Sequence, residues 1–156
     1  MKNAMNLIDA DRATTLYEAI GPATEVSGGS AANTAVGISL LGGHAGFIGK
    51  VGADMLARIF RHDIEAVGVE ALLAAQPDLQ TACSYILVTP DKKRTMNTYL
   101  GASIALKPVD MNADAIAAAD IVYIEGYLYD APDGPACWDK IATVAREAGT
   151  RIAVSL

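Results

Sequence analysis

The chain contains 156 residues, a length that predicts one domain with a core of its own. Apolar residues make up 52% of it and charged residues 19%, which excludes an intrinsically disordered protein. The formal net charge is −6 and no basic stripe is present. Nucleic-acid binding is therefore disfavoured, because it needs clustered Lys and Arg against phosphates.

The sequence also predicts the compartment. No apolar run reaches the roughly 18 residues of a membrane span, and the first residues lack the apolar stretch of a signal peptide. Cys83 and Cys137 stand far apart, without metal-type spacing, and are expected to be reduced and partly buried. We therefore expect a cytoplasmic protein with no membrane partner.

Predicted strands and helices alternate along the chain. Helices are indicated by apolar residues at helical spacing and by cap residues, since Asp9, Ser30 and Asp54 stand where helices would begin and Gly68 where one would end. Short apolar runs between Gly and Pro clusters indicate strands. The expected elements are strand 5–8, helix 9–20, strand 24–26, helix 31–41, strand 45–51, helix 55–67, strands 81–89 and 94–100, helix 112–119, strand 121–125, helix 134–148 and strand 151–156.

This alternation indicates βαβ units and hence an α/β fold with a largely parallel sheet. Residues 81–100 interrupt the pattern, because two extended runs flank the four-residue loop 90–93, as in a hairpin. An antiparallel ribbon inserted in this way often serves as a flap over a site.

Common catalytic motifs are missing. The Gly49-Lys50 pair lies in a stretch that does not satisfy the phosphate-binding P-loop pattern, and no dinucleotide-binding G-x-G-x-x-G run is present. The only histidines, His44 and His62, favour surface positions over a nucleophilic triad. Lys50 is expected to be solvated or paired, Asp54 to be a helix cap, and Trp138 to lie in the core.

The segment from Gly28 to Asn33, GGSAAN, is the first candidate site. Two glycines allow the backbone to approach a ligand closely, and the first-turn amides of a helix are free donors. The Asn33 amide could bridge two hydroxyls of a polyhydroxylated ligand. A tightly packed, capped helix explains the same residues equally well.

The run from Gly28 to Gly43, GGSAANTAVGISLLGG, resembles the first signature of the ribokinase-like (PfkB-type) carbohydrate and nucleoside kinases. The resemblance continues in register through AGFIGKVGAD (45–54), the Gly-Val pair 68–69, RTMNTYLGA (94–102) and EGYL (125–128). The third of these runs is similar to the lid strand of the adenosine-kinase-like branch. Ala57 departs from the family pattern, which often has glycine there.

The resemblance implies a ribokinase-like α/β core with a small β-lid, as a partial domain over 1–156 with lid strands near 3–8, 22–27 and 81–100. The family's sugar-contacting loop matches Gly28, Gly29 and Asn33. Strand alternation puts Asn97 and Tyr99 on one face of the ribbon, where they would face the ligand or simply alternate on a half-exposed strand. Glu125 ends a strand, as a hydroxyl-binding residue or as an exposed carboxylate.

The family would transfer the γ-phosphoryl group of ATP, with Mg²⁺, to a hydroxyl of a sugar or nucleoside. No match is found for its G-A-G-D motif, which carries the catalytic aspartate, nor for the N-x-x-E motif or the ATP-binding region. The catalytic Asp is expected beyond Leu156, and the family's first strand before Met1. The chain thus resembles the N-terminal half of such a kinase.

Two other interpretations stay open. The chain could be a non-catalytic ligand-binding module derived from the same fold. It could also be an oligomerising module that forms a homodimer through its lid strands, because free strand edges invite pairing.

Overall fold

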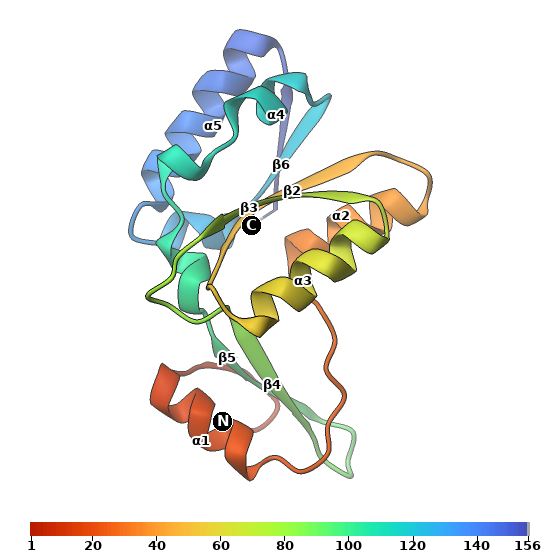
Figure 1. Ribbon diagram of the computed structural model, residues 1–156, viewed down its shortest axis with the longest axis vertical. Coiled ribbons are helices and arrows are strands. Elements are labelled where there is room, and N and C mark those ends of the chain that lie inside the picture. The colour runs from red at the N-terminus through yellow and green to blue at the C-terminus, as the bar shows by residue number, and fades with distance from the viewer. Residues whose placement is uncertain (156) are drawn as a thin grey trace.

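The computed structural model describes residues 1–155, which form two pairs of parallel strands and a separate three-stranded sheet, with helices around them (Figure 1). The elements are β1 (Met5–Leu7), α1 (Ala10–Ala19), α2 (Ser30–Leu40), β2 (Ala45–Val51), α3 (Met55–Ala66), β3 (Val69–Ala75), β4 (Cys83–Val88), β5 (Arg94–Tyr99), α4 (Ala113–Ala118), β6 (Ile121–Glu125), α5 (Gly134–Ala148) and β7 (Arg151–Ser155). Three short 3-10 helices are η1 (Gly101–Ala105), η2 (Pro108–Asp110) and η3 (Gly126–Asp130).

Strands β2 and β3 form the first parallel pair, joined by α3, which begins where the Asp54 carboxylate accepts a hydrogen bond from the Ala57 amide. Helices α2 and α3 cover one face of this pair. Their contact is an apolar cluster centred on Ala35, Ile64 and Val69, in which the rings of Phe47 and Phe60 meet edge to face. The burial of these side chains is what keeps the two helices on the pair.

Strands β6 and β7 form the second parallel pair, joined by α5. A second apolar cluster packs α4 and α5 against it and contains Ile116, Ile124, Ile141 and the fully buried Cys137. Ile48 of β2 packs against this cluster from the other pair. The core is therefore layered, with α2 and α3 on one side of the strands and α4 and α5 on the other.

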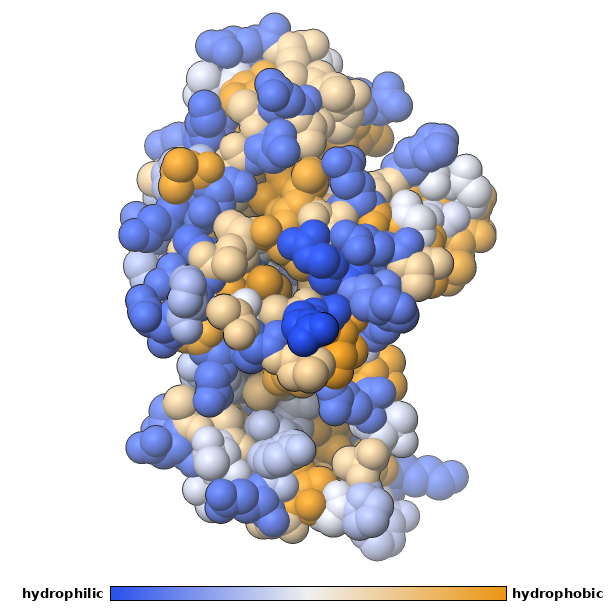
Figure 2. Space-filling view, viewed as in Figure 1, coloured by the Kyte–Doolittle hydropathy of each residue, from blue (hydrophilic) through white to orange (hydrophobic). Residues whose placement is uncertain are grey.

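Strands β1, β5 and β4, in that order, form the third sheet, which we call the lid sheet. β1 pairs with β5 in parallel and β4 pairs with β5 antiparallel. Helix α1, capped by Asp9, packs on one face of the sheet. Lid sheet and α1 lie at one end of the molecule (Figure 1), and a narrower waist separates that end from the core (Figure 2).

The α/β fold with a partly parallel sheet is confirmed, as are the helices begun by Asp9 and Asp54 and the hairpin 81–100. The expected strand 24–26, within the supposed lid segment 22–27, is wrong, because these residues form no strand. Conversely, β3 was not expected. Its sequence, VEALLAA, is rich in Ala and Leu and lacks the β-branched character of a strand.

Several single-residue expectations can also be compared with the structure. Cys83 and Cys137 are free, as expected, and His44 and His62 are exposed. Trp138 is partly buried beside the apolar cluster of α5, with its ring edge-on to that of Tyr129. No helix in the described part of the chain is long and apolar enough to cross a membrane.

Candidate functional site

The start of α2 is the first part of the candidate site. Gly29 is the N-cap residue and has φ +113°, a conformation that a side chain would strain. Ser30 is already the first helical residue and its side chain does not cap the helix, so the predicted Ser30 cap is wrong. The backbone N–H of Asn33 donates to the Gly29 carbonyl at 2.8 Å and closes the first turn of the helix. The backbone N–H groups before it have no side-chain acceptor at the cap.

Gly28 and Asn33 line one pocket of about 180 Å³ between α2, α3 and the loop before α2. Its other lining residues include Phe60, Ile64 and Asp63 of α3. Asp63 accepts a hydrogen bond from the Ser27 hydroxyl, which with His62 beside it holds the pKa of the Asp63 carboxyl below its usual range. The pocket thus offers an amide, a carboxylate and glycine backbone beside apolar walls.

Glu125 is the last residue of β6 and is half-buried. It pairs in register with Ser155, so both lie at the carboxyl ends of their strands. Helix α2, which carries Asn33, contacts β6. In open α/β sheets, ligands bind outside the carboxyl ends of the strands, which is the edge where Glu125 lies.

Asn97 and Tyr99 lie in the lid sheet, on the face that α1 covers. Asn97 stands opposite Tyr85, and both are half-buried on the side where α1 contacts β4 and β5. The pKa of Tyr85 is raised to about 12, mainly by burial and to a lesser extent by the neighbouring Cys83 and Tyr17. The structure therefore turns Asn97 and Tyr99 toward α1 and does not bring them to the open face of the sheet.

The open face of the lid sheet is mostly apolar, and Ser84, Arg94 and Thr98 are its polar residues. Met5, Leu7, Ile86 and Val88 are 51%, 62%, 51% and 66% exposed there. Met96 pairs with both Met5 and Ile86, and Thr98 pairs with Leu7, so Met96 and Thr98 share this face. The sequence pattern separates the two faces of β5, and only the position of α1 shows which of them is free.

A buried ion pair lies at the end of β2. Lys50 Nζ is 2.7 Å from Asp110 Oδ2, and the two side chains are 6% and 12% exposed. The same oxygen accepts a hydrogen bond from the Lys107 amide at 2.8 Å. Lys50 is therefore paired, and the pair holds the end of β2 to η2.

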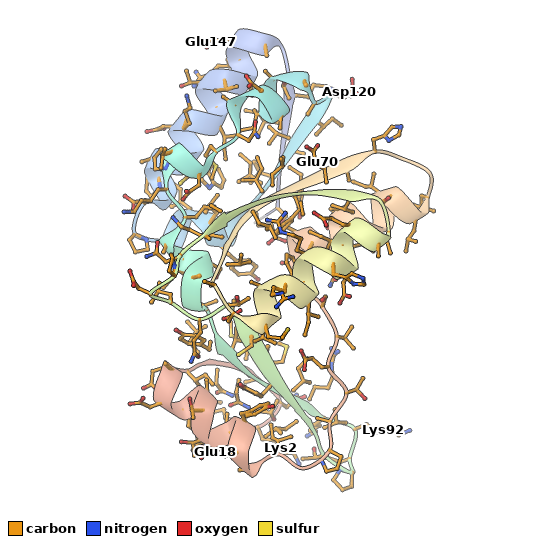
Figure 3. All side chains as sticks on the ribbon, in the orientation of Figure 1. Lys2, Glu18, Glu70, Lys92, Asp120 and Glu147 are labelled. Carbon is orange, nitrogen blue, oxygen red and sulfur yellow. The ribbon has the colours of Figure 1, made fainter. Side chains whose placement is uncertain are left out.

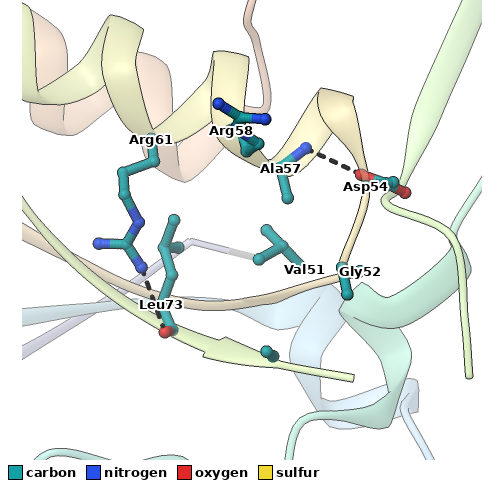
Figure 4. A pocket seen from close by; sticks show the side chains of 9 residues that line it. Val51, Gly52, Asp54, Ala57, Arg58, Arg61 and Leu73 are labelled. Atoms are coloured by element: carbon teal, nitrogen blue, oxygen red, sulfur yellow. Dashed lines mark hydrogen bonds between the residues drawn. The ribbon is translucent and has the colours of Figure 1, made fainter. Parts of the chain in front are cut away.

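A larger pocket of about 340 Å³ lies at the turn between β2 and α3 (Figure 4). Val51, Leu73 and Ala75 form its apolar wall, and Arg58 and Arg61 of α3 border it. The Arg61 guanidinium donates to the carbonyl oxygens of Ala71 and Leu73 at 2.9 and 3.5 Å. Sequence reasoning missed this pocket, because Leu73 and Ala75 of its wall belong to the unexpected strand β3.

Among residues 1–155, no three His, Cys, Asp or Glu side chains lie together in a way that could hold a metal ion. Mg²⁺ in ATP-dependent enzymes usually binds one or two carboxylates together with substrate phosphates, and the described residues assign neither a Mg²⁺ nor an ATP ligand.

Known kinases, both curated proteins and solved structures, are similar to this chain. The crystal structure of an adenosine kinase from Sinorhizobium meliloti is 47% identical, with a TM-score of 0.91, over 100% of this chain and 48% of that one. A structure described as a probable sugar kinase from Rhizobium etli is 48% identical, with a TM-score of 0.90, over 99% of this chain and 47% of that one. An ATP-dependent ribose-1-phosphate kinase from Halopiger xanaduensis is 34% identical over 148 residues, which are 90% of this chain and 48% of that protein.

The chain therefore spans about half the length of the relatives it matches. The two structures confirm the ribokinase-like fold that the sequence resemblance implied. The model of the pfkB family of carbohydrate kinases matches residues 5–156. With nearly its whole length matched, this chain belongs to the pfkB carbohydrate kinase family.

Proposed function

We propose that the chain forms the acceptor-binding half of an ATP-dependent kinase that phosphorylates a hydroxyl group of a sugar or nucleoside. The observation that carries the proposal is the start of α2, where Gly28 and Asn33 line one pocket at an uncapped helix N-terminus. The free backbone N–H groups at the start of α2 are donors, and the side-chain amide of Asn33 is both donor and acceptor. Together they match the alternating donors and acceptors of a vicinal diol. Family membership supports the same reaction class.

Glu125 supplies the second contact of the proposal. As the carboxylate that ends β6, it can accept hydrogen bonds from hydroxyls at the edge of the sheet, while Asn33 approaches from α2. Charge-assisted hydrogen bonds of this kind are stronger than neutral ones. Glu125 does not line the pocket at the start of α2, so the proposed acceptor reaches from that pocket toward the carboxyl end of β6.

The lid sheet would cover this acceptor with its open face. Met96 and Thr98 are the central residues of that face and replace Asn97 and Tyr99 as the proposed lid contacts. An apolar side chain suits the face of a sugar ring or a base, and the Thr98 hydroxyl, which lies 2.9 Å from that of Ser84, offers a polar contact.

Phosphoryl transfer would need further groups. It depends on a residue that orients the nucleophile and on donors that stabilise charge on the transferred group. In the proposal these groups, together with ATP and Mg²⁺, belong to the part of the relatives that this chain does not span. We therefore expect no useful transfer by the 156-residue chain in a coupled ADP-release assay with adenosine, ribose or fructose.

A binding assay tests the proposal directly. Sugars and nucleosides are first screened by thermal shift, since a ligand that binds the native state raises the apparent midpoint. Titration calorimetry then compares the best ligand on wild type, Asn33→Ala and Thr34→Ala. Loss of the Asn33 amide should weaken binding by on the order of 1–3 kcal/mol, whereas Thr34, exposed and bonded only to the Ser30 carbonyl, should not matter. Equal affinities for all three proteins would refute the site.

The open face of the lid sheet favours a second candidate function, a homodimer formed through the lid. Contiguous exposed apolar side chains mark interaction surfaces, and among residues 1–155 no strand pairs with the outer edge of β4. Native mass spectrometry of wild type and Ile86→Lys distinguishes the two functions. A dimer abolished by Ile86→Lys supports the interface, and a monomeric wild type rules it out.

A further inference from the structure

Besides residues 20–29, which lead from α1 to α2, two chain segments on either side of the β4–β5 hairpin connect the core and the lid sheet close to the carboxyl end of β2. Residues 76–82 lead from β3 to β4, and residue 100 leads from β5 to η1. The two segments are joined by the hydrogen bond from the Ala102 amide to the Gln80 carbonyl, 2.8 Å long. They therefore cross the waist as one connection.

Asp54 attaches this connection to the core. Its Oδ1 accepts the Ala57 amide at 2.9 Å and the Thr81 hydroxyl at 2.7 Å, and its Oδ2 accepts the Thr81 amide at 2.7 Å. The Thr81 hydroxyl in turn accepts the Gly52 amide at 2.9 Å. One carboxylate thus caps α3 and also holds the segment that leads into β4.

The packing around these bonds is tight. Thr81 is buried, and a Cβ on Gly52 would stand 2.8 Å from the Thr81 amide, a distance too short for a real contact. A Cβ on Gly101 would collide with the Gln80 carbonyl. Both segments therefore have little room to slide against the β2–α3 turn.

The ionisation state of Asp54 agrees with this geometry. Burial disfavours the charged carboxylate, but the hydrogen bonds from Thr81 and Ala57 together outweigh it and hold the pKa of Asp54 below its usual value. To cap α3, Asp54 needs only the hydrogen bond from the Ala57 amide. The additional bonds all come from Thr81, the residue that precedes the lid.

We propose that Asp54 and Thr81 are positioning residues that set the orientation of the lid sheet over the carboxyl ends of the core strands. The inference rests on the proposed function to the extent that the lid covers an acceptor. The attachment itself concerns only the core and the lid, so it can be measured without any ligand. If the orientation is lost, the open face of the lid sheet no longer meets the acceptor at a fixed distance.

Electron-spin distance measurements on the whole chain test the attachment. Labels are placed on cysteines introduced at Glu18 on α1 and Glu70 on β3, which are exposed on the lid and the core (Figure 3). The background carries Cys83→Ser, and Cys137, with no exposed surface, is protected from labelling.

Four variants separate the attachment from the cap. Asp54→Ser keeps a residue that can cap α3 but is too short to reach Thr81, and Thr81→Val removes the hydroxyl at nearly constant volume. Thr81→Ser restores the hydroxyl. Asn112→Ala is the matched control, because Asn112 caps α4 through the Ala115 amide without a hydrogen bond to the lid.

We expect Asp54→Ser and Thr81→Val to broaden the Glu18–Glu70 distance distribution, while Thr81→Ser and Asn112→Ala leave it at the wild-type width. In Thr81→Val the Gly52 amide should also exchange with solvent about tenfold faster, because it has lost its acceptor. Protection of the β2 and β3 amides verifies that each variant is folded.

Wild-type width in both Asp54→Ser and Thr81→Val would overturn the proposal. If one of these two variants does not fold, the width of the distance distribution in the other variant decides the proposal. Acceptor titration of the same variants is a separate readout: broadening without any acceptor binding in wild type would leave the attachment standing and refute the proposed function.

Discussion

Replacing Lys50 by Met should destabilise the chain strongly, since it removes one member of a buried ion pair. Asp110, 12% exposed, would be left with the Lys107 amide as its remaining hydrogen-bond donor. Leaving one charge of such a pair uncompensated costs about 3–5 kcal/mol. Because domains of this size are stable by about 5–15 kcal/mol, the variant would lose a large share of its stability.

Urea unfolding with linear extrapolation measures this loss. Adding Asp110→Asn should recover most of it, because the neutral amide no longer needs a cation and its oxygen can still accept the Lys107 amide. Glu65→Gln is the control, since Glu65 pairs with Arg61 at 50% and 43% exposure and such surface pairs contribute about 0.3–0.5 kcal/mol. The reasoning is refuted if Lys50→Met costs no more than this control, or if the double variant is less stable than Lys50→Met alone.

Four further outcomes are expected. Gly101→Ala should lose at least about 2 kcal/mol in the same unfolding assay, because its φ of +46° and the Gln80 carbonyl both oppose a Cβ; a smaller loss would contradict the tight crossing. Gly37→Ala, in α2 with open space around it, should instead gain about 0.5–1 kcal/mol. Asp54 has a lowered pKa in the folded state. Its contribution to the free energy of unfolding is therefore complete above the ordinary pKa of about 3.9 and is lost as pH falls through the folded value. Acid unfolding of Asp54→Asn should depend less steeply on pH in this range. Tyr85, with a pKa near 12, should ionise last in an ultraviolet titration. The stability of the fold should also fall as pH rises above about 10, because Tyr85 ionises at lower pH in the unfolded chain than in the folded one. A Tyr85→Phe variant that shows the same late transition would contradict the assignment.

Most of the elements could be predicted because local patterns determine them. Asp9 and Asp54 cap helices as expected, since a carboxylate before an amphipathic run satisfies first-turn amides whatever surrounds it. Strand β3 could not be predicted, because its Ala and Leu residues favour a helix and are extended only by pairing with β2. Here tertiary contacts override local propensity.

The candidate site was predictable to a similar degree. The Gly28–Asn33 segment combines a glycine requirement with a helix start, and both can be recognised in the sequence. The orientation of Asn97 could not be, because alternation along β5 defines two faces but not the one that α1 covers. Asp54 was expected as a cap, and its bonds to Thr81 depend on a loop whose path no local pattern specifies.

Strand β1 differs from the other strands in how far along the chain its partner lies. β2 and β3 are joined through α3, β6 and β7 through α5, and β4 and β5 through a short loop, so each of these pairs can form from one continuous stretch of chain. β1, by contrast, pairs Asn6 with Asn97, and closing that long loop has an entropic cost that the local pairs avoid. During synthesis β1 is therefore made long before its partner β5 and stays without it until β5 follows. Until the two strands pair, that edge of β5 is open to any other strand, including the β1 of a neighbouring chain.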